Sequence, residues 1–325
     1  MNQRYDDAFG IIIDTEQPGN IGNNRQFAYY AEGNYIVKWE NKSKNATTGG
    51  MVLDFDMPGI HEIQFIGGLE RFAMLDNERD YNCYDWRKIL SIEQWGNIKW
   101  KDMSYMFFGC TNITANFNDV PITKEVTNIR GMFANALNFN DTFPLNETGA
   151  CDDMSSLFYM NEKFNGNLDN LDVGNVRDMS RMFMGAKSFI GDLSGWDVSN
   201  VIDMSGMFMG AKSFNGDLSG WNVSNVRDMS GMFMGAESFN GDLSGWDVGN
   251  VRYMGEMFMG AESFSGDLSG WNVSNVRNMN RMFYFARSFN ADLSDWDIRM
   301  VKDDHQNFDA VIHSWVLPRP VWEIL

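Results

Sequence analysis

A column of carboxyl and carboxamide side chains recurs every 25 residues and has the chemistry to bind hydroxyl groups or a cation. Its members are Asp172, Asp197, Asn222, Asp247, Asn272 and Asp297. Strands stacked about 4.8 Å apart would bring like carboxylates into repulsive contact, and from position 197 onward Asp alternates with Asn. We take this column as the predicted ligand-binding site, for glycan hydroxyl groups or weakly bound Ca²⁺. The alternative is that the alternation only relieves repulsion on a solvated face.

A second column is apolar and comprises Met184, Met209, Met234, Met259 and Tyr284. At 100° per residue it lies about 140° from the centre of the apolar face of a short predicted helix. Its side chains either pack between adjacent repeats or form an exposed apolar stripe that binds a protein. Together with Trp322, these residues are the predicted partner-binding site.

Two further columns are basic and amidic. Arg177, Arg227, Arg252 and Arg277 follow the same period beside acidic neighbours such as Asp178 and Asp228. Ion pairing between repeats is one interpretation of the arginines, and an anion-binding stripe is the other. Asn200, Asn225, Asn250 and Asn275 are predicted to hydrogen-bond the backbone of a neighbouring repeat.

The sequence offers little for catalysis. Its only histidines are His61, His305 and His313, and no metalloprotease, nucleotide-binding or nucleophile-elbow motif is present. The carboxylates repeat identically, whereas an active site needs groups whose environments separate their pKa values. We therefore expect no enzyme and no cofactor, apart from weakly bound Ca²⁺.

The composition narrows the range of partners. The chain of 325 residues carries a formal charge of -18, with 44% apolar and 14% aromatic residues. Such an acidic chain is a poor ligand for nucleic acid, which binds through Lys and Arg. The sequence shows no signal peptide and no apolar stretch of about 20 residues, so we expect no membrane insertion.

Each 25-residue repeat divides into two predicted elements. In "MSRMFMGA" the apolar residues Met179, Met182, Phe183 and Ala186 follow helical spacing, although Gly185 weakens a helix from inside. In "LSGWDVSNV" apolar and polar residues alternate, as in a short strand. Phe and Trp columns with the same period predict a continuous core built from stacked repeats.

The residues "GDLSGWDVSNV" and "DMSGMFMGA" resemble the BspA-like leucine-rich-repeat family, also described by its DUF285 repeat. The resemblance covers about residues 101–315 and departs from the family at the arginine column, where Thr is usual. It implies a surface-displayed binding protein and not an enzyme. In this family the N-terminal position often carries a small β-sandwich, and Trp39–Asn41 and Pro58–His61 look like degraded forms of its motifs.

We therefore expect an α/β solenoid of about nine 25-residue leucine-rich-like repeats, with a short strand and a short helix in each. The expected domains are a small all-β sandwich of the PKD or Ig type at 1–97, the solenoid at 98–315, and an apolar docking segment at 316–325. That segment either covers the terminal repeat or anchors the protein to an assembly.

The expected function is recognition by a binding module displayed on a virion or cell surface, outside the cell. Its solenoid would contact a host-surface glycan or protein. The alternative is a structural component of a larger assembly, such as a phage head or tail accessory protein. In that case the solenoid would be a rigid spacer bound to other structural proteins of the same assembly.

Overall fold

The structure is a computed structural model that describes residues 5–75, 84–141, 145, 147–301, 305–309 and 315–322. His313 and the last three residues of the predicted docking segment lie outside these ranges. The chain forms two compact units, one of Met1–Cys151 with Asn170–Asp172 and one of Asp152–Asp169 with Val173–Leu325. The predicted domain limits at 97 and 315 remain predictions.

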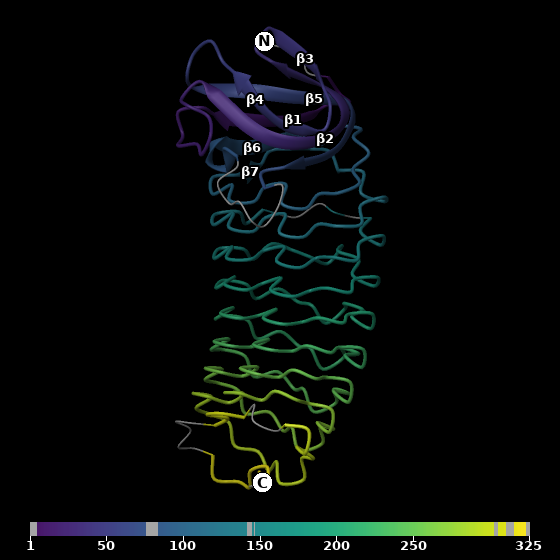
Figure 1. Cartoon of the computed structure of the whole chain (residues 1–325), viewed down its shortest axis with the longest axis vertical. Coiled ribbons are helices and arrows are strands. Elements are labelled where there is room, and N and C mark those ends of the chain that lie inside the picture. The colour runs from purple at the N-terminus through teal and green to yellow at the C-terminus, as the bar shows by residue number, and fades with distance from the viewer. Residues whose placement is uncertain are drawn as a thin grey trace. The chain divides into compact units, whose positions relative to one another are not determined.

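The N-terminal unit contains one seven-stranded mixed sheet (Figure 1). Its strands are β1 (Phe9–Asp14), β2 (Gln26–Trp39), β3 (Lys42–Ala46), β4 (Gly49–Asp54), β5 (Ile60–Ala73), β6 (Ile89–Gln94) and β7 (Thr114–Ala115). The strand order is β3-β2-β5-β1-β6-β7, and β4 also pairs with β2. All pairs are antiparallel except β6 with β7.

The expected β-sandwich is wrong, because the described strands form a single sheet. Strand β2 runs for 14 residues without a break. Residues 26–31 of β2 pair with β4, residues 35–39 pair with β3, and residues 30–39 pair with β5. Because β2 pairs with all three of β3, β4 and β5, these strands belong to one hydrogen-bonded sheet.

An aromatic cluster fills the interior of the N-terminal unit. Phe9 packs its ring against those of Phe65, Phe72, Trp95 and Trp100, with ring centroids 5.1–5.7 Å apart. All five side chains are fully buried. The angles between these rings all differ, so this core consists of aromatic contacts that are not repeated.

The short 3-10 helix η1 (Trp86–Lys88) positions a buried ion pair. Lys88 Nζ lies 3.2 Å from the Asp85 carboxylate, and both side chains are fully buried. Lys88 also donates to the carbonyl oxygens of Gly22, Asn23 and Gln26. The Asp85 carboxylate accepts from backbone N–H groups of residues 20, 21, 22 and 28. The pair therefore organises the loop before β2.

The second unit consists of stacked 25-residue repeats, seen in Figure 1 as successive layers. Single-residue parallel bridges connect equivalent positions of consecutive repeats, at Asp153, Asp178, Asp203, Asp228, Tyr253 and Asn278. The expected α/β solenoid is wrong, since the described residues contain no α-helix in any repeat. The expected strand at "LSGWDV" is absent as well, and turns occupy its place.

The predicted helical segment is a row of turns with two alternating hydrogen-bond patterns. Backbone N–H groups of Met179, Arg181, Phe183 and Gly185 donate to the next repeat, at 2.7–3.0 Å. The N–H groups of Met182, Met184 and Ala186 donate three residues back within their own repeat. An α-helix would direct each of them four residues back. The repeat thus divides its hydrogen bonds between local turns and its neighbour.

Left-handed backbone conformations prevent the helix. The first left-handed position of each repeat has φ of 57° at Arg181, 61° at Gly206 and 61° at Gly231. The second has φ of 75° at Gly185 and 65° at Gly235. A right-handed helix cannot include such residues, and glycine adopts them at the least steric cost. The glycine position that weakened the helix prediction is therefore one of the left-handed positions that form the turns.

One repeat contains three turns with the pattern Asp-x-Ser, and most other repeats keep Asp or Asn as the first residue of two or three of them. In that repeat, Asp192, Asp197 and Asp203 accept from the N–H of the residue two positions later, at 2.8–3.0 Å. Side-chain carbonyl oxygens commonly stabilise turns in this way. The repeated "DLS", "DVS" and "DMS" triplets therefore set the corners of the repeat.

The predicted apolar columns are confirmed as the core. Trp196, Trp221, Trp246, Trp271 and Trp296 stack with centroids 6.4–6.5 Å apart and nearly parallel rings. Trp221 and Phe233 are only 3% and 0% exposed. The Trp221 indole N–H donates to the Leu193 carbonyl of the preceding repeat. Trp246, Trp271 and Trp296 make the equivalent bond, whereas the buried indole N–H of Trp196 has no partner among the described residues.

The described part of the C-terminal segment packs on the last repeats. The Trp315 ring contacts Phe283 and Phe289, and its indole N–H donates to Ala291. Pro318 accepts a hydrogen bond from the N–H of Leu293 at 2.9 Å. Residues 315–318 therefore pack on the terminal repeat, while Val316 and Val321 remain 78% and 71% exposed. Whether segment 316–325 covers this repeat or anchors the protein stays open.

Candidate functional site

The predicted ligand-binding column lies on turns and not on a strand. Asp172, Asp197, Asn222, Asp247 and Asn272 are exposed, and Asp297 is half-buried. In each from Asp197 onward, one side-chain oxygen accepts from the N–H two residues later. One oxygen per residue is therefore already used for turn formation, which leaves fewer ligand atoms than an exposed strand would offer.

Local hydrogen bonds also govern the charge of this column. The Ser199 hydroxyl and N–H lower the pKa of Asp197. Hydrogen bonds from the Arg299 side chain lower the pKa of Asp297 to about 2. In the part of the chain that the structure describes, no group of three or more His, Cys, Asp or Glu side chains is placed to hold a metal ion. Weak Ca²⁺ binding stays a prediction.

The predicted partner-binding methionines form a half-buried stripe. Met184, Met209, Met234, Met259 and Tyr284 all have intermediate exposure. The methyl group of Met209 lies over Gly231 of the next repeat, 2.8 Å from where a β-carbon would be. The stripe therefore packs partly between repeats and shows the rest of its surface. Binding of a partner to it remains a prediction.

Trp322 lies apart from this stripe. Its ring stacks on His305 with centroids 4.3 Å apart and meets the edge of Phe308 at 5.2 Å. Its ring therefore has neighbours within the chain, and the structure does not bring it together with the methionine column.

The arginine and asparagine columns come together in a groove. Asn225, Arg227, Asn250, Arg252, Asn275 and Arg277 line this groove, which has a volume of about 320 Å³. All six residues are exposed. We call this surface the Arg–Asn groove. The 25-residue spacing of the two columns does not by itself predict that they line one site.

Backbone hydrogen bonds hold the groove in register. The N–H of Arg252 donates to Arg227 at 2.9 Å, and that of Arg277 donates to Arg252 at 2.8 Å. The Nδ2 groups of Asn225, Asn250 and Asn275 donate to carbonyl oxygens of the preceding repeat, at 2.7–2.8 Å. The predicted Asn ladder is confirmed, and consecutive arginines are placed one repeat apart.

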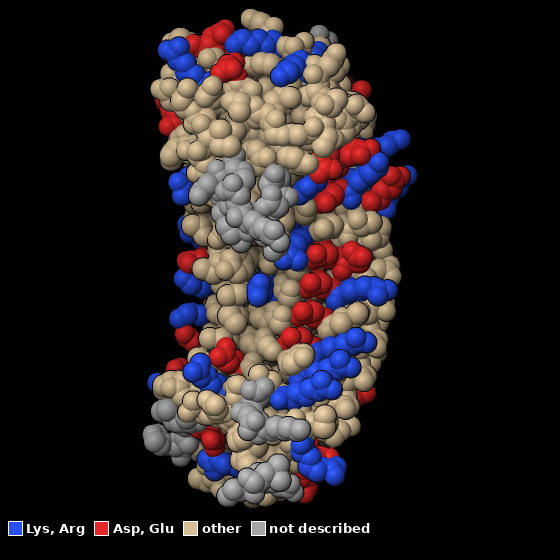
Figure 2. All heavy atoms as spheres, in the orientation of Figure 1, with Lys and Arg blue, Asp and Glu red and all other residues tan. Residues whose placement is uncertain are grey.

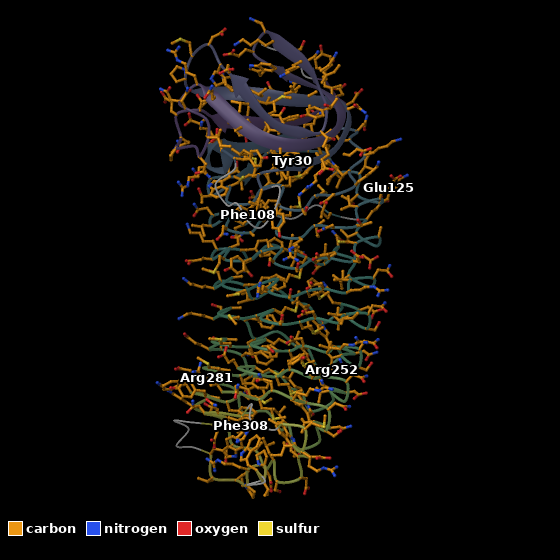
Figure 3. All side chains as sticks on the ribbon, viewed as in Figure 1. Tyr30, Phe108, Glu125, Arg252, Arg281 and Phe308 are labelled. Atoms are coloured by element: carbon orange, nitrogen blue, oxygen red, sulfur yellow. The ribbon has the colours of Figure 1, made fainter. Side chains whose placement is uncertain are left out.

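The arginines of the groove make no ion pair with any described acidic side chain, so ion pairing between repeats is not their role in this structure. In contrast, Lys187, Lys212, Arg281 and Arg287 each pair with a Glu exactly one repeat away, at 2.6–3.6 Å. Figure 3 shows Arg252 and Arg281 on opposite sides of the repeats. On the face shown in Figure 2, a row of acidic side chains runs along part of the repeats, with basic side chains beside it.

A family model described as "Mycoplasma protein of unknown function, DUF285" matches residues 81–147, 145–236 and 214–314. Together these matches cover 81–314, which is more than half of the chain. The chain belongs to the DUF285 family. No curated protein and no solved structure matches it. The Arg–Asn groove lies entirely within the third DUF285 match.

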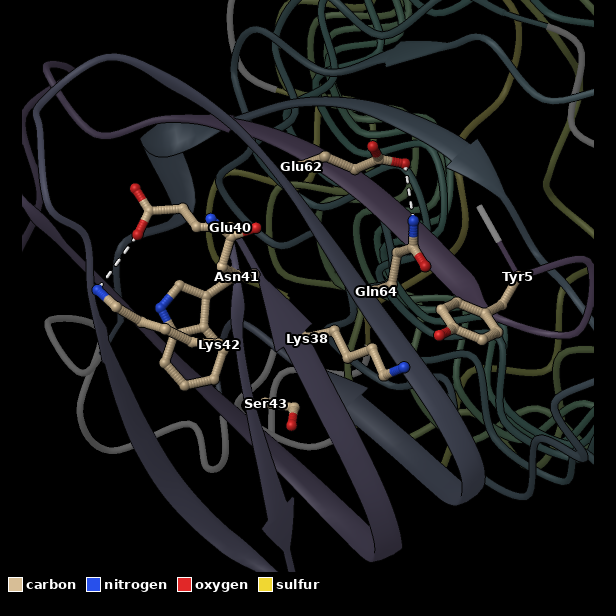
Figure 4. Close-up of a pocket in the computed structure, with 9 residues that line it drawn as sticks. Tyr5, Lys38, Glu40, Asn41, Lys42, Ser43, Glu62 and Gln64 are labelled. Atoms are coloured by element: carbon tan, nitrogen blue, oxygen red, sulfur yellow. Dashed lines mark hydrogen bonds and ion pairs between the residues drawn. The ribbon is translucent and has the colours of Figure 1, made fainter. Parts of the chain in front are cut away.

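A second hollow lies outside the DUF285 matches, in the N-terminal sheet (Figure 4). It has a volume of about 240 Å³ and is lined by Tyr5, Lys38, Trp39, Glu40, Asn41, Lys42, Ser43, Glu62 and Gln64. Lys38 lies over the Tyr5 ring at 3.8 Å. Lys42 pairs with Asp56 and Glu40, and its hydrogen bond to Asp56 raises its pKa. Its cations thus already have partners, unlike the arginines of the Arg–Asn groove.

The described residues of this DUF285 protein include no helix of the length and hydrophobicity needed to cross a membrane.

Proposed function

We propose that this DUF285 protein is a non-enzymatic recognition module whose repeats bind an extended partner surface. One observation carries the proposal. Backbone hydrogen bonds place the same polar side chain at the same position of consecutive repeats, as at Arg227, Arg252 and Arg277. A partner that itself repeats can then form the same contact several times, which raises its overall affinity.

The proposed setting is a virion or cell surface, with a host-surface glycan or protein as the partner. The BspA-like motifs in the repeats support this setting, because proteins with such motifs are surface-displayed. The exposed Asp/Asn column and the half-exposed methionine stripe supply two further surfaces that repeat once per layer. Catalysis plays no part in this proposal.

A structural role is the second candidate, with the repeats as a rigid spacer in a larger assembly such as a phage head or tail. The observation that favours it is the continuous ladder of Phe and Trp rings, which resists bending. In that case the partners would be other structural proteins of the same assembly, and the repeat number would set a length.

The test changes the number of repeats without creating a new junction. Residues 204–228 and 229–253 are nearly identical, so deleting 204–228 joins Asp203 to a copy of its normal neighbour. Duplicating the same segment adds one repeat. Binding of the three proteins to a glycan array and to immobilised cell-surface proteins would be measured, and thermal melts would check that all three fold.

Recognition predicts that affinity falls on deletion and rises on duplication, because the number of repeated contacts changes. The spacer role predicts that none of the three proteins binds the glycan array or the cell-surface proteins. It also predicts that a change in repeat number impairs assembly with the other structural proteins. An affinity that is the same for all three proteins would show that the partner binds at one place and would contradict an extended contact.

A further inference from the structure

The Arg–Asn groove concentrates positive charge that the protein itself does not neutralise. Arg227, Arg252 and Arg277 lie one repeat apart, a distance of about 4.8 Å for chains in parallel pairing. Like charges at this spacing repel each other. Basic side chains elsewhere on the repeats form ion pairs with a Glu one repeat away, as Lys212 does with Glu237. An external anion would relieve the repulsion in the groove.

The asparagines add acceptors of fixed orientation. Because only Nδ2 can donate to a carbonyl, the bonds from Asn225, Asn250 and Asn275 to the preceding repeat fix each amide. The Oδ1 atoms accept no hydrogen bond from any described residue. The groove therefore offers one guanidinium donor and one carboxamide acceptor per repeat, side by side.

This alternation specifies the chemistry of a ligand. A guanidinium binds carboxylate or sulfate through paired N–H donors. A carboxamide oxygen binds a hydroxyl group. A matching ligand must present both an anionic group and a hydroxyl group at each step of about 4.8 Å, along an extended chain. A linear polysaccharide of acidic sugars has this pattern, since each sugar carries hydroxyl groups and its length is close to one step.

Single-stranded nucleic acid fits the groove less well. Such binding combines phosphate contacts with base stacking on aromatic rings, and the six lining residues include no aromatic side chain. A polyphosphate or an acidic peptide would satisfy the arginines, but its repeat unit lacks the hydroxyl groups that match the asparagines.

We infer that the Arg–Asn groove binds linear acidic polysaccharides, with Arg227, Arg252 and Arg277 holding carboxylate or sulfate groups and the neighbouring asparagines accepting from sugar hydroxyls. This inference rests on the proposed recognition function and names its ligand class.

The test uses the full-length protein and defined probes. Binding to polygalacturonate, dextran sulfate, uncharged dextran, polyglutamate and polyuridylate would be measured by biolayer interferometry. The variant removes three charges from the groove, as Arg227→Gln, Arg252→Gln and Arg277→Gln. The matched control removes three charges elsewhere on the repeats, as Lys212→Gln, Arg281→Gln and Arg287→Gln. Thermal melts would confirm that both variants keep the fold.

We expect the wild-type protein to bind polygalacturonate or dextran sulfate but not dextran. Raising NaCl from about 50 mM to about 200 mM should weaken binding by about tenfold or more. The groove variant should lose about tenfold or more in affinity, and the control should stay within about twofold. Preference for polygalacturonate over dextran sulfate would identify carboxylate as the anion bound.

Three results would overturn the inference. The first is no binding to either acidic polysaccharide, and the second is equal loss in the groove and control variants. The third is tighter binding of polyuridylate or polyglutamate, which would keep an anion site but reject the polysaccharide. If the wild-type protein and groove variant bound a neutral glycan or a protein surface equally well, the recognition function would stand and only this inference would fail.

Discussion

The two compact units stabilise their interiors in different ways. The N-terminal unit buries a charged pair, Asp85 and Lys88, whose hydrogen-bond partners lie up to 66 residues away in the sequence. In the repeat unit no described charged side chain is buried. Its interior is made of a few apolar side chains, such as Phe233 and Trp246, which recur in register. One interior depends on contacts that occur once, and the other depends on copies of the same contact.

This difference determines how each unit should respond to damage. Removing one member of the buried pair leaves the other charge buried without a counter-ion, and no other side chain can replace the lost hydrogen bonds. Removing one ring of a stack leaves the layers above and below with their own hydrogen bonds and rings. We therefore expect the largest single-residue losses in the N-terminal unit and smaller losses in the repeats.

The largest effect should come from Lys88→Met. The substitution leaves the buried Asp85 carboxylate without its cation and three carbonyl oxygens without a donor. Breaking a buried pair in this way costs about 3–5 kcal/mol of unfolding free energy. Urea unfolding followed by circular dichroism would measure it.

A double-mutant cycle supplies the control for this pair. Asp85→Asn combined with Lys88→Met removes both charges, so the double variant should lose less stability than the sum of the single variants. A loss below about 1 kcal/mol for Lys88→Met would show that the pair does not organise the loop before β2.

Phe233→Ala should have the second largest effect, about 3 kcal/mol. The fully buried ring stacks on Phe239 at 4.0 Å and on its copies in both adjacent repeats at 5.7 Å, so truncation leaves a cavity. Met234→Ala, at a half-buried position, should cost about 1 kcal/mol or less. Equal losses at the two positions in urea unfolding would contradict the core assigned to the Phe column.

Gly235→Ala should cost about 1–2 kcal/mol, because φ is 65° and a β-carbon is unfavourable in that conformation. Gly245→Ala is the matched control, since a β-carbon there would meet nothing within 4 Å and φ is not positive. The control should leave the melting temperature unchanged or slightly raised. If Gly235→Ala were equally harmless, left-handed turns would not be what excludes the helix.

The smallest effect concerns the acidic bridge column. Burial raises the pKa of Asp203, and the neighbouring Asp178 and Asp228 carboxylates raise it further. A raised pKa means that ionisation destabilises the fold, so this loss sets in as pH rises from the usual Asp value of about 3.9 through the folded pKa. Asp203→Asn should therefore raise the melting temperature slightly at pH 7. Its turn is kept, because Asn278 accepts the equivalent bond.

The opposite sign applies to the turn carboxylates. The Ser219 N–H lowers the pKa of Asp217, so its contribution is present above about pH 3.9 and is lost as pH falls through the folded pKa. The gain in melting temperature from Asp203→Asn should disappear near pH 4, where Asp203 is protonated. Asp217→Asn should give no gain in melting temperature at pH 7. NMR titration of the side-chain carboxyl carbons would check both directions. An unshifted Asp203 would show that the bridge column is fully solvated.

The sequence alone determined the period, the core columns and the Asn ladder. A residue copied every 25 positions superposes on its copies in a stacked structure, so Phe233 and Trp221 had to share one apolar interior. The same reasoning placed Asn250 against the backbone of its neighbour, because a carboxamide repeated in register finds the same carbonyl each time.

Tertiary structure alone decided how each layer is built. Helical spacing of Met179, Met182 and Phe183 is equally compatible with a row of turns, and only hydrogen bonds between repeats select the turns over a helix. Those bonds need left-handed residues, which the spacing of apolar side chains does not reveal.

The structure also decided between one sheet and two, and between paired and unpaired arginines. The single sheet follows from the pairing of β2 with β3, β4 and β5, which the sequence does not specify. Arg227, Arg252 and Arg277 stay unpaired because repeated backbone bonds place them beside one another and beside asparagines, whereas Lys212 lies within reach of Glu237. Spacing along the chain is the same for both groups, and only the three-dimensional position of the nearest carboxylate separates them.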